Sequence, residues 1–305
     1  MKKLLLLALS AIPYFASAQT THKYLIKTGK LFDSEAGQFK TGLDVVSTGF
    51  VEKGGDFGSD KVHYIKPVHV AVVMGSGISS LVSGEVWHFF EQQIGYPLTV
   101  VNESNLDEVD WKAIDVLILP DGTYKYLSEK ENAARLKDWI SAGGKLIAMQ
   151  DALSQLSMLD WGIKPKKQDE DIFEKKNDYA ALKSFANKER DGIKQLIPGA
   201  IYKVQLDNTH PLAFGYPDTY YTLKQDSKIY EFLEDGGWNV GVLKKDNYLS
   251  GFVGADTRKK LKDGLLFGVK EIGDGRVVML ADDPLFRSFW ENGKLLFGNA
   301  VFMVF

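Results

Sequence analysis

Residues 143–156, GGKLIAMQDALSQL, have the pattern of a buried strand that turns sharply into a helix. In many α/β enzymes this turn is a strained elbow that carries a Ser or Cys nucleophile. Here the turn holds Gln150 and Asp151, and the chain contains no cysteine. An aspartate acts as a nucleophile or general base only when a partner tunes it. Asp151 is therefore a candidate catalytic residue, and Gln150 and Asp151 are candidate ligand-binding residues.

A second group of polar residues lies in ADDPLFR, residues 281–287, after an apolar run that has the character of a central strand. Asp282 and Asp283 are candidate catalytic carboxylates, and Asp282 and Arg287 are candidate ligand-binding residues. A crevice lined by carboxylates, an amide and a guanidinium results if this loop and the elbow open on the same edge of a sheet. The alternative is structural, with Asp283-Pro284 starting a helix and Arg287 pairing with a carboxylate.

The loop GSGISS, residues 75–80, follows the first apolar strand and begins like a dinucleotide-binding fingerprint, but Ser80 stands at the third glycine position. A partial fingerprint is weak support for phosphate binding. Small residues in a tight strand-to-helix turn explain the loop equally well. Ser76 and Ser79 remain able to bind a ligand at the start of the helix.

A zinc site is a further alternative, because His88 and Glu91 match the HxxE spacing of metallocarboxypeptidases and His210 lies downstream. Neighbouring aromatic residues instead favour a helix surface for His88 and Glu91, and His210-Pro211 is ordinary loop sequence. We expect no metal and no cofactor.

The elements that position these residues alternate between strands and helices. Apolar runs predict strands at 69–74, 97–102, 116–122 and 145–150, and helices are predicted at 84–95 and 128–144, the latter capped by Ser128. This alternation indicates βαβ units and a mostly parallel sheet with helices on both faces. Ligands of such sheets bind at the carboxyl ends of the strands.

The second half of the chain is richer in short β-runs. Residues 164–191 hold eight basic and seven acidic residues, which is typical of a solvated helical insertion, about 160–200. Short strands are predicted at 201–206, 219–223, 238–243 and 249–253, followed by a hairpin over 265–286 and a terminal helix.

The first 18 residues have the pattern of a secretory signal peptide: Lys2 and Lys3, an apolar run, and Ala16-Ser17-Ala18 before a cleavage site at Gln19. Export predicts a periplasmic or extracellular location. Removal of the two lysines leaves 35 Lys and Arg against 40 Asp and Glu. This mildly acidic balance argues against nucleic-acid or anionic-membrane partners. Without cysteine, the chain has no disulfide and no thiol nucleophile.

Several phrases together resemble a known domain. They are KPVHVAVVMGSGISSLVSGEVWHFFEQQIGYPLTVV, DVLILPDGTY, LKDWISAGGKLIA, HPLAFGYPDTYY and VVMLADDPLFRSFWENGKLLFGNAVF, spread from Lys66 to Phe305. Their combination resembles the C-terminal class I glutamine amidotransferase-like domain of secreted bacterial zinc carboxypeptidases. The resemblance implies a flavodoxin-like three-layer sandwich with β-rich additions. It also implies no peptidase domain, because residues 19–66 are too few to form one.

The resemblance also implies lost chemistry. An amidotransferase places Cys at the elbow and His and Glu after a late strand, whereas this chain has Gln150 and Asp282-Asp283 there. We therefore expect residues 19–66 to form an extended arm or small β-annex and residues 67–305 to form an amidotransferase-like α/β domain. The expected function is that of an exported, non-catalytic module that binds a peptide, a glycan or a peptidase partner. The alternative is a hydrolase, either carboxylate-dependent or a zinc carboxypeptidase-type remnant.

Overall fold

The computed structural model describes residues 24–33, 38–47, 67–167, 182 and 184–305. The contacts divide the chain into two units, residues 1–65 and 66–305. In the first unit an antiparallel hairpin joins β1 (Tyr24–Asp33) to β2 (Gln38–Ser47). The predicted signal peptide lies outside the described residues.

The second unit is built on one ten-stranded sheet. Its strands are β3 Val70–Met74, β4 Thr99–Asn102, β5 Val116–Leu119, β6 Lys145–Met149, β7 Gly199–Leu206, β8 Thr219–Lys224, β9 Gly237–Leu243, β10 Tyr248–Phe252, β11 Gly264–Ile272 and β12 Gly275–Leu280. The helices are α1 Ser80–His88, α2 Lys125–Ser128, α3 Lys130–Ser141, α4 Gln150–Leu156, α6 Lys188–Gln195, α7 Ala255–Lys260 and α8 Glu291–Phe302. Shorter turns are a π-helix η1, Phe89–Ile94, and the 3-10 segments η2 Glu103–Glu108, η3 Trp111–Ala113, η5 Phe185–Asn187, η6 Pro211–Ala213 and η7 Phe286–Ser288.

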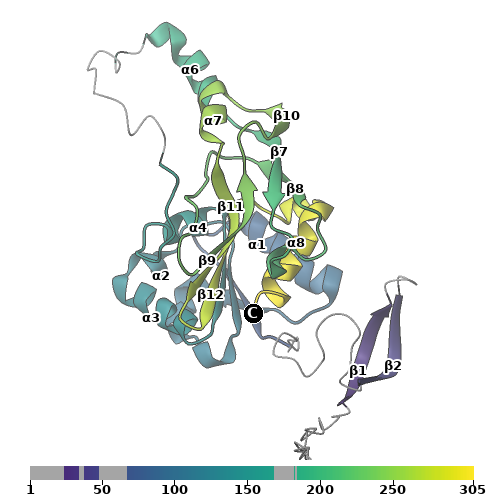
Figure 1. Cartoon of the computed structure of the whole chain (residues 1–305). Helices are drawn as coiled ribbons and strands as arrows, with labels where there is room; N and C mark the ends of the chain where they lie inside the picture. Colours follow the sequence, from purple (N-terminus) through teal and green to yellow (C-terminus); the bar gives the residue numbers. More distant parts are fainter. Residues whose placement is uncertain (1–23, 34–37, 48–66, 168–181, 183) are drawn as a thin grey trace, which may run out of the picture. The chain divides into compact units, whose positions relative to one another are not determined.

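Half of the sheet is parallel, in the order β4-β3-β5-β6-β12. If these five strands are renumbered 1 to 5 as they follow one another along the chain, their order in the sheet is 2-1-3-4-5. This is the strand order of flavodoxin-like folds. Figure 1 shows α2 and α3 on one side of these strands and α8 on the other, so three layers result. The predicted fold class is confirmed. The β-rich additions extend the same sheet through antiparallel strands, from β11 outward through β9 and β7 to β10, with β8 also paired to β7.

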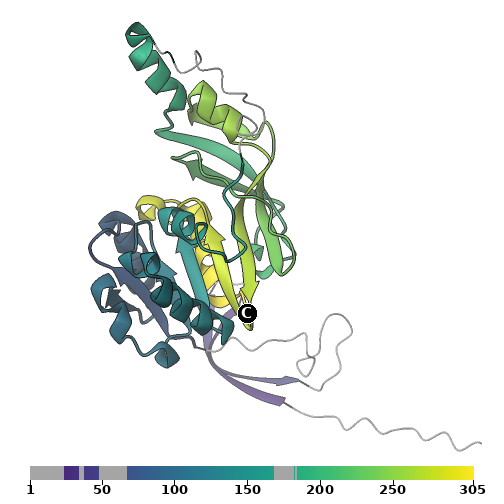
Figure 2. The ribbon, with the colours of Figure 1, turned by 90° about the vertical axis from the view of Figure 1, so that its left-hand side faces the viewer.

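The apolar runs become strands because both faces of the sheet are covered. All four residues of β5 are buried, as are most residues of β3, β6 and β12. On one face Phe89 packs edge-on against Phe297 of α8, with ring centroids 5.2 Å apart. On the opposite face, Trp139 of α3 packs against Trp111, and their ring centroids are 5.4 Å apart. The side view in Figure 2 shows the parallel half enclosed by helices, with the antiparallel strands rising above it.

The two helices predicted in the parallel half begin at other residues than the sequence suggests. The first helix begins at Ser80, after the cap Ser79, and continues beyond His88 as a π-helix. Ser128 does not cap α3 but ends the short helix α2, and the cap position of α3 is Glu129, whose side chain forms no capping bond. The predicted charged insertion contains α6, and residues 168–181 and 183 of it lie outside the described residues.

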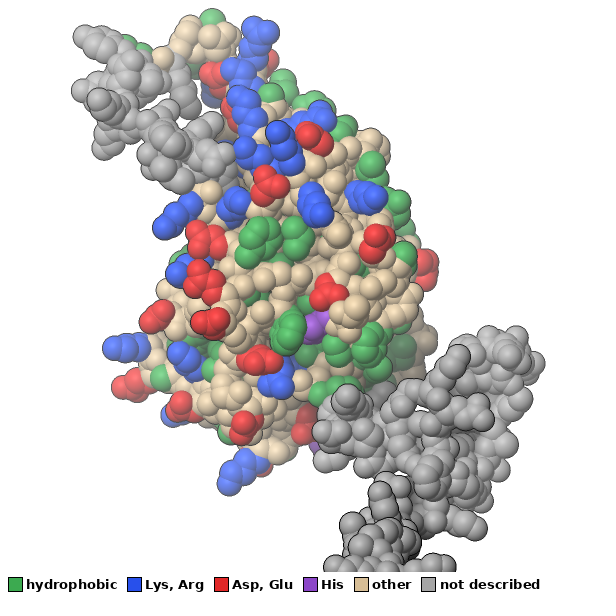
Figure 3. Space-filling model, in the orientation of Figure 1, with side chains coloured by type: hydrophobic (Ala, Val, Ile, Leu, Met, Phe, Trp, Pro, Cys, Tyr) green, Lys and Arg blue, Asp and Glu red, His purple; other side chains and the backbone are tan. Residues whose placement is uncertain are grey.

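Charge is unevenly spread over the second unit. The helices α6 and α7 carry the basic residues Lys188, Arg190, Lys194, Arg258, Lys259 and Lys260. Figure 3 shows Lys and Arg side chains gathered at this end, while acidic and hydrophobic side chains and a histidine lie lower on the same face. The same two helices also carry the acidic residues Glu189, Asp191 and Asp256.

Candidate functional site

The strained elbow expected between β6 and α4 is present. Gln150 has a φ of 45°, in the left-handed region that side chains other than glycine rarely adopt. The cause is the abrupt change from a buried strand ending at Met149 to a helix beginning at Gln150. The fold therefore presents the Gln150 side chain at the position where related turns present a nucleophile. Its Oε1 atom is buried and has no hydrogen-bond partner among the described residues.

Close backbone contacts hold the neighbouring loop against the turn after β3. The N–H of Thr123 donates to the carbonyl of Gly77 at 2.9 Å, and the N–H of Ser79 donates to the carbonyl of Asp121 at 2.8 Å. A Cβ on Gly77, whose φ is 86°, would lie 2.7 Å from the Thr123 carbonyl oxygen. Glycine is therefore required there, and its place is structural: it fixes the loop that carries Asp121.

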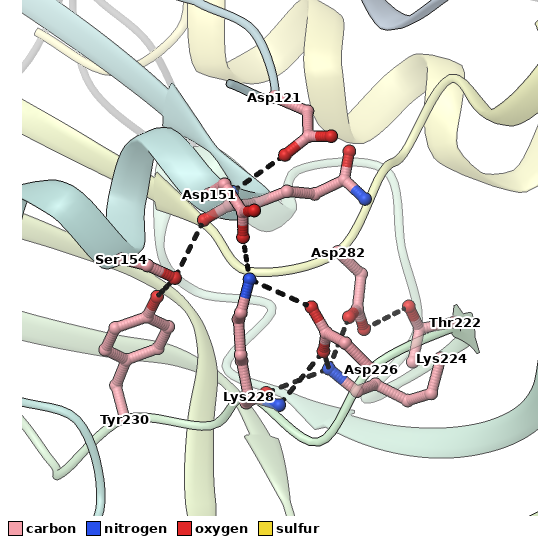
Figure 4. A network of polar contacts seen from close by, with 10 residues as sticks. Asp121, Asp151, Ser154, Thr222, Lys224, Asp226, Lys228, Tyr230 and Asp282 are labelled. Atoms are coloured by element: carbon pink, nitrogen blue, oxygen red, sulfur yellow. Dashed lines mark hydrogen bonds and ion pairs between the residues drawn. The ribbon is translucent and has the colours of Figure 1, made fainter. Parts of the chain in front are cut away.

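Asp121 connects this loop to the elbow. Its Oδ1 accepts a hydrogen bond of 3.0 Å from the backbone N–H of Asp151. Partial burial raises the pKa of Asp121; Lys228 opposes this effect and Asp226 adds to it. The Asp151 carboxylate forms an ion pair with Lys228, which lies in the loop after β8 (Figure 4). Both side chains of this pair remain partly exposed, so the pair borders solvent.

Behind this pair lies a buried ionic cluster centred on Lys224 (Figure 4). The Lys224 ammonium donates to Asp282 at 2.6 Å, to Asp226 at 2.9 Å and to the carbonyl of Lys228 at 2.8 Å. The Lys224 side chain is wholly buried and that of Asp282 nearly so. Burial alone would lower the pKa of Lys224, but the two carboxylates outweigh burial and raise it. Lys224 is therefore a fixed cation inside the fold.

Both oxygens of Asp282 are occupied. One accepts from Lys224, and the other accepts from the Thr222 hydroxyl at 2.7 Å. Burial raises the pKa of Asp282 above its ordinary value, although the Lys224 ammonium beside it opposes this effect. Because donors satisfy both oxygens, Asp282 stands as the anion of a buried ion pair. Its position is structural.

Asp226 links the buried cluster to the elbow. Its Oδ1 accepts from Lys224 and from the backbone N–H of Lys228, and its Oδ2 lies 3.8 Å from the Lys228 ammonium. On the other side of the elbow, the Ser154 hydroxyl lies 3.2 Å from the hydroxyl of Tyr230. Burial raises the pKa of Tyr230 to about 12, so this hydroxyl stays protonated at neutral pH. The network thus runs from Asp121 through Asp151, Lys228 and Asp226 to the Lys224–Asp282 pair.

Asp283 belongs to a different cluster. Its side chain is buried beside Glu85 of α1, and its Oδ1 accepts from the N–H of Leu285 at 2.8 Å. Burial, together with a hydrogen bond and charge repulsion from Glu85, raises the pKa of Asp283 to about 8. Glu85 in turn accepts from the backbone N–H of Arg287 at 2.6 Å. Asp283 thus holds the loop after β12 against α1.

The remaining candidates do not join the elbow network. Ser76 is exposed in the loop after β3, and Ser79 caps α1 by accepting from the N–H of Val82 at 3.4 Å. The Arg287 guanidinium lies over the ring of Phe286, 5.2 Å from its centroid. Within the described ranges, no hydrogen bond or ion pair joins Ser76 or the Arg287 side chain to Asp151 or Asp282. Of the predicted ligand-binding residues, the network therefore joins Asp151 and Asp282, and Gln150 directly precedes Asp151 at the elbow.

The zinc candidates are also not assembled into a site. His88 ends α1 and Glu91 is exposed on η1, whereas His210 caps η6 by accepting from the N–H of Leu212 at 3.1 Å. Among the residues that the structure describes, no group of three His, Asp or Glu side chains is arranged to hold a metal ion.

Sequence reasoning missed Asp121, Lys224, Asp226 and Lys228. Asp121 lies in PDG after a predicted strand, so the rule about carboxyl ends of parallel strands could have identified it. The other three lie in LKQDSK after an antiparallel strand, where that rule gives no signal. Only the pairing of β8 with β7 and of β7 with β9 brings them to the elbow.

Comparisons with known proteins bear on the fold. No protein-family model matches the chain, and no curated protein matches it. A solved structure described as a ThuA-like protein from Bacteroides uniformis is 13% identical, with a TM-score of 0.47, covering 80% of this chain and 94% of that one. Another described as ThuA-like, from Parabacteroides merdae, is 12% identical with a TM-score of 0.49, covering 77% and 89%.

A β-galactosidase from Bacillus circulans sp. alkalophilus is 14% identical with a TM-score of 0.45, covering 77% of this chain and 30% of that one. None of these three descriptions names a carboxypeptidase, so that relation stays a prediction. Identities this low carry no activity or ligand to this chain. The strand order and the elbow make the chain an α/β protein with a class I glutamine amidotransferase-like, flavodoxin-type fold.

Proposed function

We propose that this chain is an exported, non-catalytic binding module that binds a neutral, polyhydroxylated ligand, a glycan, at the elbow network. The observation that carries the proposal is the Gln150 side chain, whose Oε1 is buried without a partner at a strained turn. A buried acceptor without a donor costs about 1–3 kcal/mol. A ligand hydroxyl that donates to this oxygen recovers that cost, which favours binding.

The charge of the network supports a neutral ligand that is rich in hydrogen-bond donors. Four carboxylates, those of Asp121, Asp151, Asp226 and Asp282, face two ammonium groups, those of Lys224 and Lys228. This excess of acceptors repels anions such as phosphates. Sugar hydroxyls donate to the partly exposed Asp151 carboxylate and to an amide oxygen without bringing an opposing charge. A glycan fits these groups better than an acidic peptide does.

The same contacts argue against a carboxylate-dependent hydrolase. An amide at the elbow is not a nucleophile, the Asp151 carboxylate is paired with Lys228, and both oxygens of Asp282 accept from internal donors. Asp283 is held in its own pair with Glu85.

Binding of neutral oligosaccharides to the mature chain tests the proposal. A glycan array selects the ligand, and isothermal titration then compares the wild-type protein with Gln150→Leu and Gln155→Leu. Gln155 is the matched control because its amide is already bonded to the N–H and the carbonyl of Tyr124, at 2.8 and 2.7 Å. We expect Gln150→Leu to weaken binding by about tenfold or more, the effect of losing one good hydrogen bond. Equal binding by wild type and Gln150→Leu contradicts the proposal.

Export is tested separately, since it depends on residues outside the described ranges. N-terminal sequencing of protein secreted by a bacterial host is expected to begin at Gln19. A retained Met1 contradicts export by signal cleavage. Within the described residues, no helix has the length and apolar character needed to cross a bilayer.

A further inference from the structure

A pocket of about 380 Å³ lies at the opposite ends of the strands from the elbow. It is lined by residues from the loop after β7, from β9 and β11, and from the start of β12, among them Asp207, His210, Trp238, Glu271 and Arg276. β12 runs parallel to β6, so the start of β12 and the elbow after β6 are at opposite ends of the strands. The pocket is therefore independent of the elbow network.

One wall of the pocket is aromatic. The Trp238 side chain leaves 53% of the residue exposed, although an indole of this size is usually covered. Its Nε1–H donates to Glu271 Oε1 at 3.2 Å, which fixes the orientation of the indole. The His210 ring lies beside it, with centroids 5.9 Å apart and planes inclined at 46°. A fixed, accessible aromatic face of this kind offers a platform for an apolar surface.

The rim of the pocket supplies directed polar groups. The N–H of Leu212 donates to His210 Nδ1, which leaves the proton of the neutral ring on Nε2 as a donor. Burial lowers the pKa of His210, so the neutral ring is the form present at pH 7. Glu271 and Arg276 face each other across β11 and β12, and Asp207 accepts from the Thr209 hydroxyl at 2.6 Å. The rim thus offers both donors and acceptors.

We propose that this pocket is a second carbohydrate site, in which one pyranose ring of a neutral saccharide stacks on Trp238 and its hydroxyls bond to Glu271, Asp207 and Arg276. A pyranose has an apolar C–H face and a hydroxyl edge, which match the aromatic wall and the polar rim. Small-ligand sites have this mixture of aromatic and few polar groups and a volume of about 300–1,000 Å³. Two carboxylates against one guanidinium disfavour a phosphate or an acidic sugar.

Indole N–H signals of the mature, isotope-labelled chain provide the test. The Trp238 signal is assigned by its loss in Trp238→Phe. The probes are five neutral trisaccharides, each built from one sugar and one linkage: glucose linked β-1,4, glucose linked α-1,4, glucose linked β-1,3, mannose linked β-1,4 and galactose linked β-1,4. We expect at least one to shift the Trp238 signal with a Kd of about 1 mM or tighter, equivalent to roughly −4 kcal/mol.

Three variants separate this site from its alternatives. Because Trp238→Ala has no indole signal at this position, the ring signals of His210, which lines the same pocket, report binding in the variants. Trp238→Ala is expected to abolish binding of the active trisaccharide at this pocket, whereas Trp87→Ala is the matched control, since Trp87 is 41% exposed on α1. Gln150→Leu is expected to leave the Trp238 shift unchanged, so this site can stand if the elbow proposal fails, and the reverse also holds. The proposal is overturned if no trisaccharide shifts the signal, if Trp87→Ala has the larger effect, or if only a dipeptide such as glycylglycine shifts it.

Discussion

The ammonium nitrogen of Lys224 lies 2.6 Å from the carboxylate of Asp282, and both side chains are buried between β8 and the end of β12. The pair joins the antiparallel extension of the sheet to its parallel half. It also fixes the loop after β8, which carries Asp226 and Lys228, beside the end of β12.

The pair makes a direct prediction about unfolding. Lys224→Met leaves Asp282 buried with only Thr222 as a side-chain donor, so the free energy of unfolding is expected to fall by about 3–5 kcal/mol. Thr222→Val removes one neutral donor and is expected to cost about 1 kcal/mol. Urea denaturation of both variants measures the difference. Equal losses would mean that the Lys224–Asp282 pair is not an ion pair.

Asp283 predicts how stability depends on pH. Its pKa is about 8 in the fold, above the ordinary value of about 3.9 in the unfolded chain. The folded protein therefore holds a proton that the unfolded chain has lost, and this contribution to stability disappears as the pH rises from about 4 to about 8. Asp283→Asn is expected to flatten the fall in unfolding free energy over that range.

The control for this measurement is Asp274→Asn, which changes an exposed carboxyl in the hairpin after β11. It is expected to leave the pH profile as in the wild type. A wild-type profile that is already flat between pH 4 and 8 contradicts the raised pKa of Asp283.

The strain at the elbow is separable from its side chain. Gln150→Gly removes both the side chain and the cost of a positive φ, whereas Gln150→Ala removes the side chain and keeps the cost. We expect the free energy of unfolding of the Gly variant to be about 1 kcal/mol higher than that of the Ala variant. Thermal denaturation of the two variants gives the comparison. A more stable Ala variant would place Gln150 outside the left-handed region.

Two glycines test the packing that positions Asp121. Gly77→Ala places a Cβ 2.7 Å from the Thr123 carbonyl oxygen at a φ of 86°, so we expect a loss of about 1–3 kcal/mol and weaker binding at the elbow. Gly84→Ala is the opposite case, because Gly84 is inside α1 with no atom near its added Cβ. It is expected to stabilise the fold by about 0.5–1 kcal/mol. Similar effects of the two changes would refute the close approach of the loops after β3 and β5.

The sequence predicts the parallel half of the fold well because its strands are buried on both faces and form unbroken apolar runs, as in VAVVM and VLIL. It predicts the elbow because a strand must turn abruptly into α4 at Gln150. It does not predict that Lys224 is buried, since a lysine at the end of TYYTLK normally extends into solvent. Its partner Asp282 is 58 residues away, and only the assembled sheet brings the two together.

The site was only partly predictable for a similar reason. Asp151 and Asp282 belong to one polar network, as their places after two neighbouring parallel strands suggest. Lys228, which neutralises Asp151, comes from a loop after an antiparallel strand, where no sequence motif marks it. Asp283 follows Asp282 directly, yet it faces Glu85 rather than the elbow, because the backbone turns after β12. The adjacency of Asp282 and Asp283 in the sequence therefore did not mean that they share a site.

The central claim is that the elbow binds a neutral glycan and does not transform it. The most direct measurement incubates the mature chain with the array-selected oligosaccharide, records binding by titration, and follows the saccharide by mass spectrometry over many hours. The account predicts saturable binding that Gln150→Leu weakens, with the mass of the saccharide unchanged. Hydrolysed or otherwise altered saccharide, formed by the wild type and absent with Asp151→Asn, would contradict it.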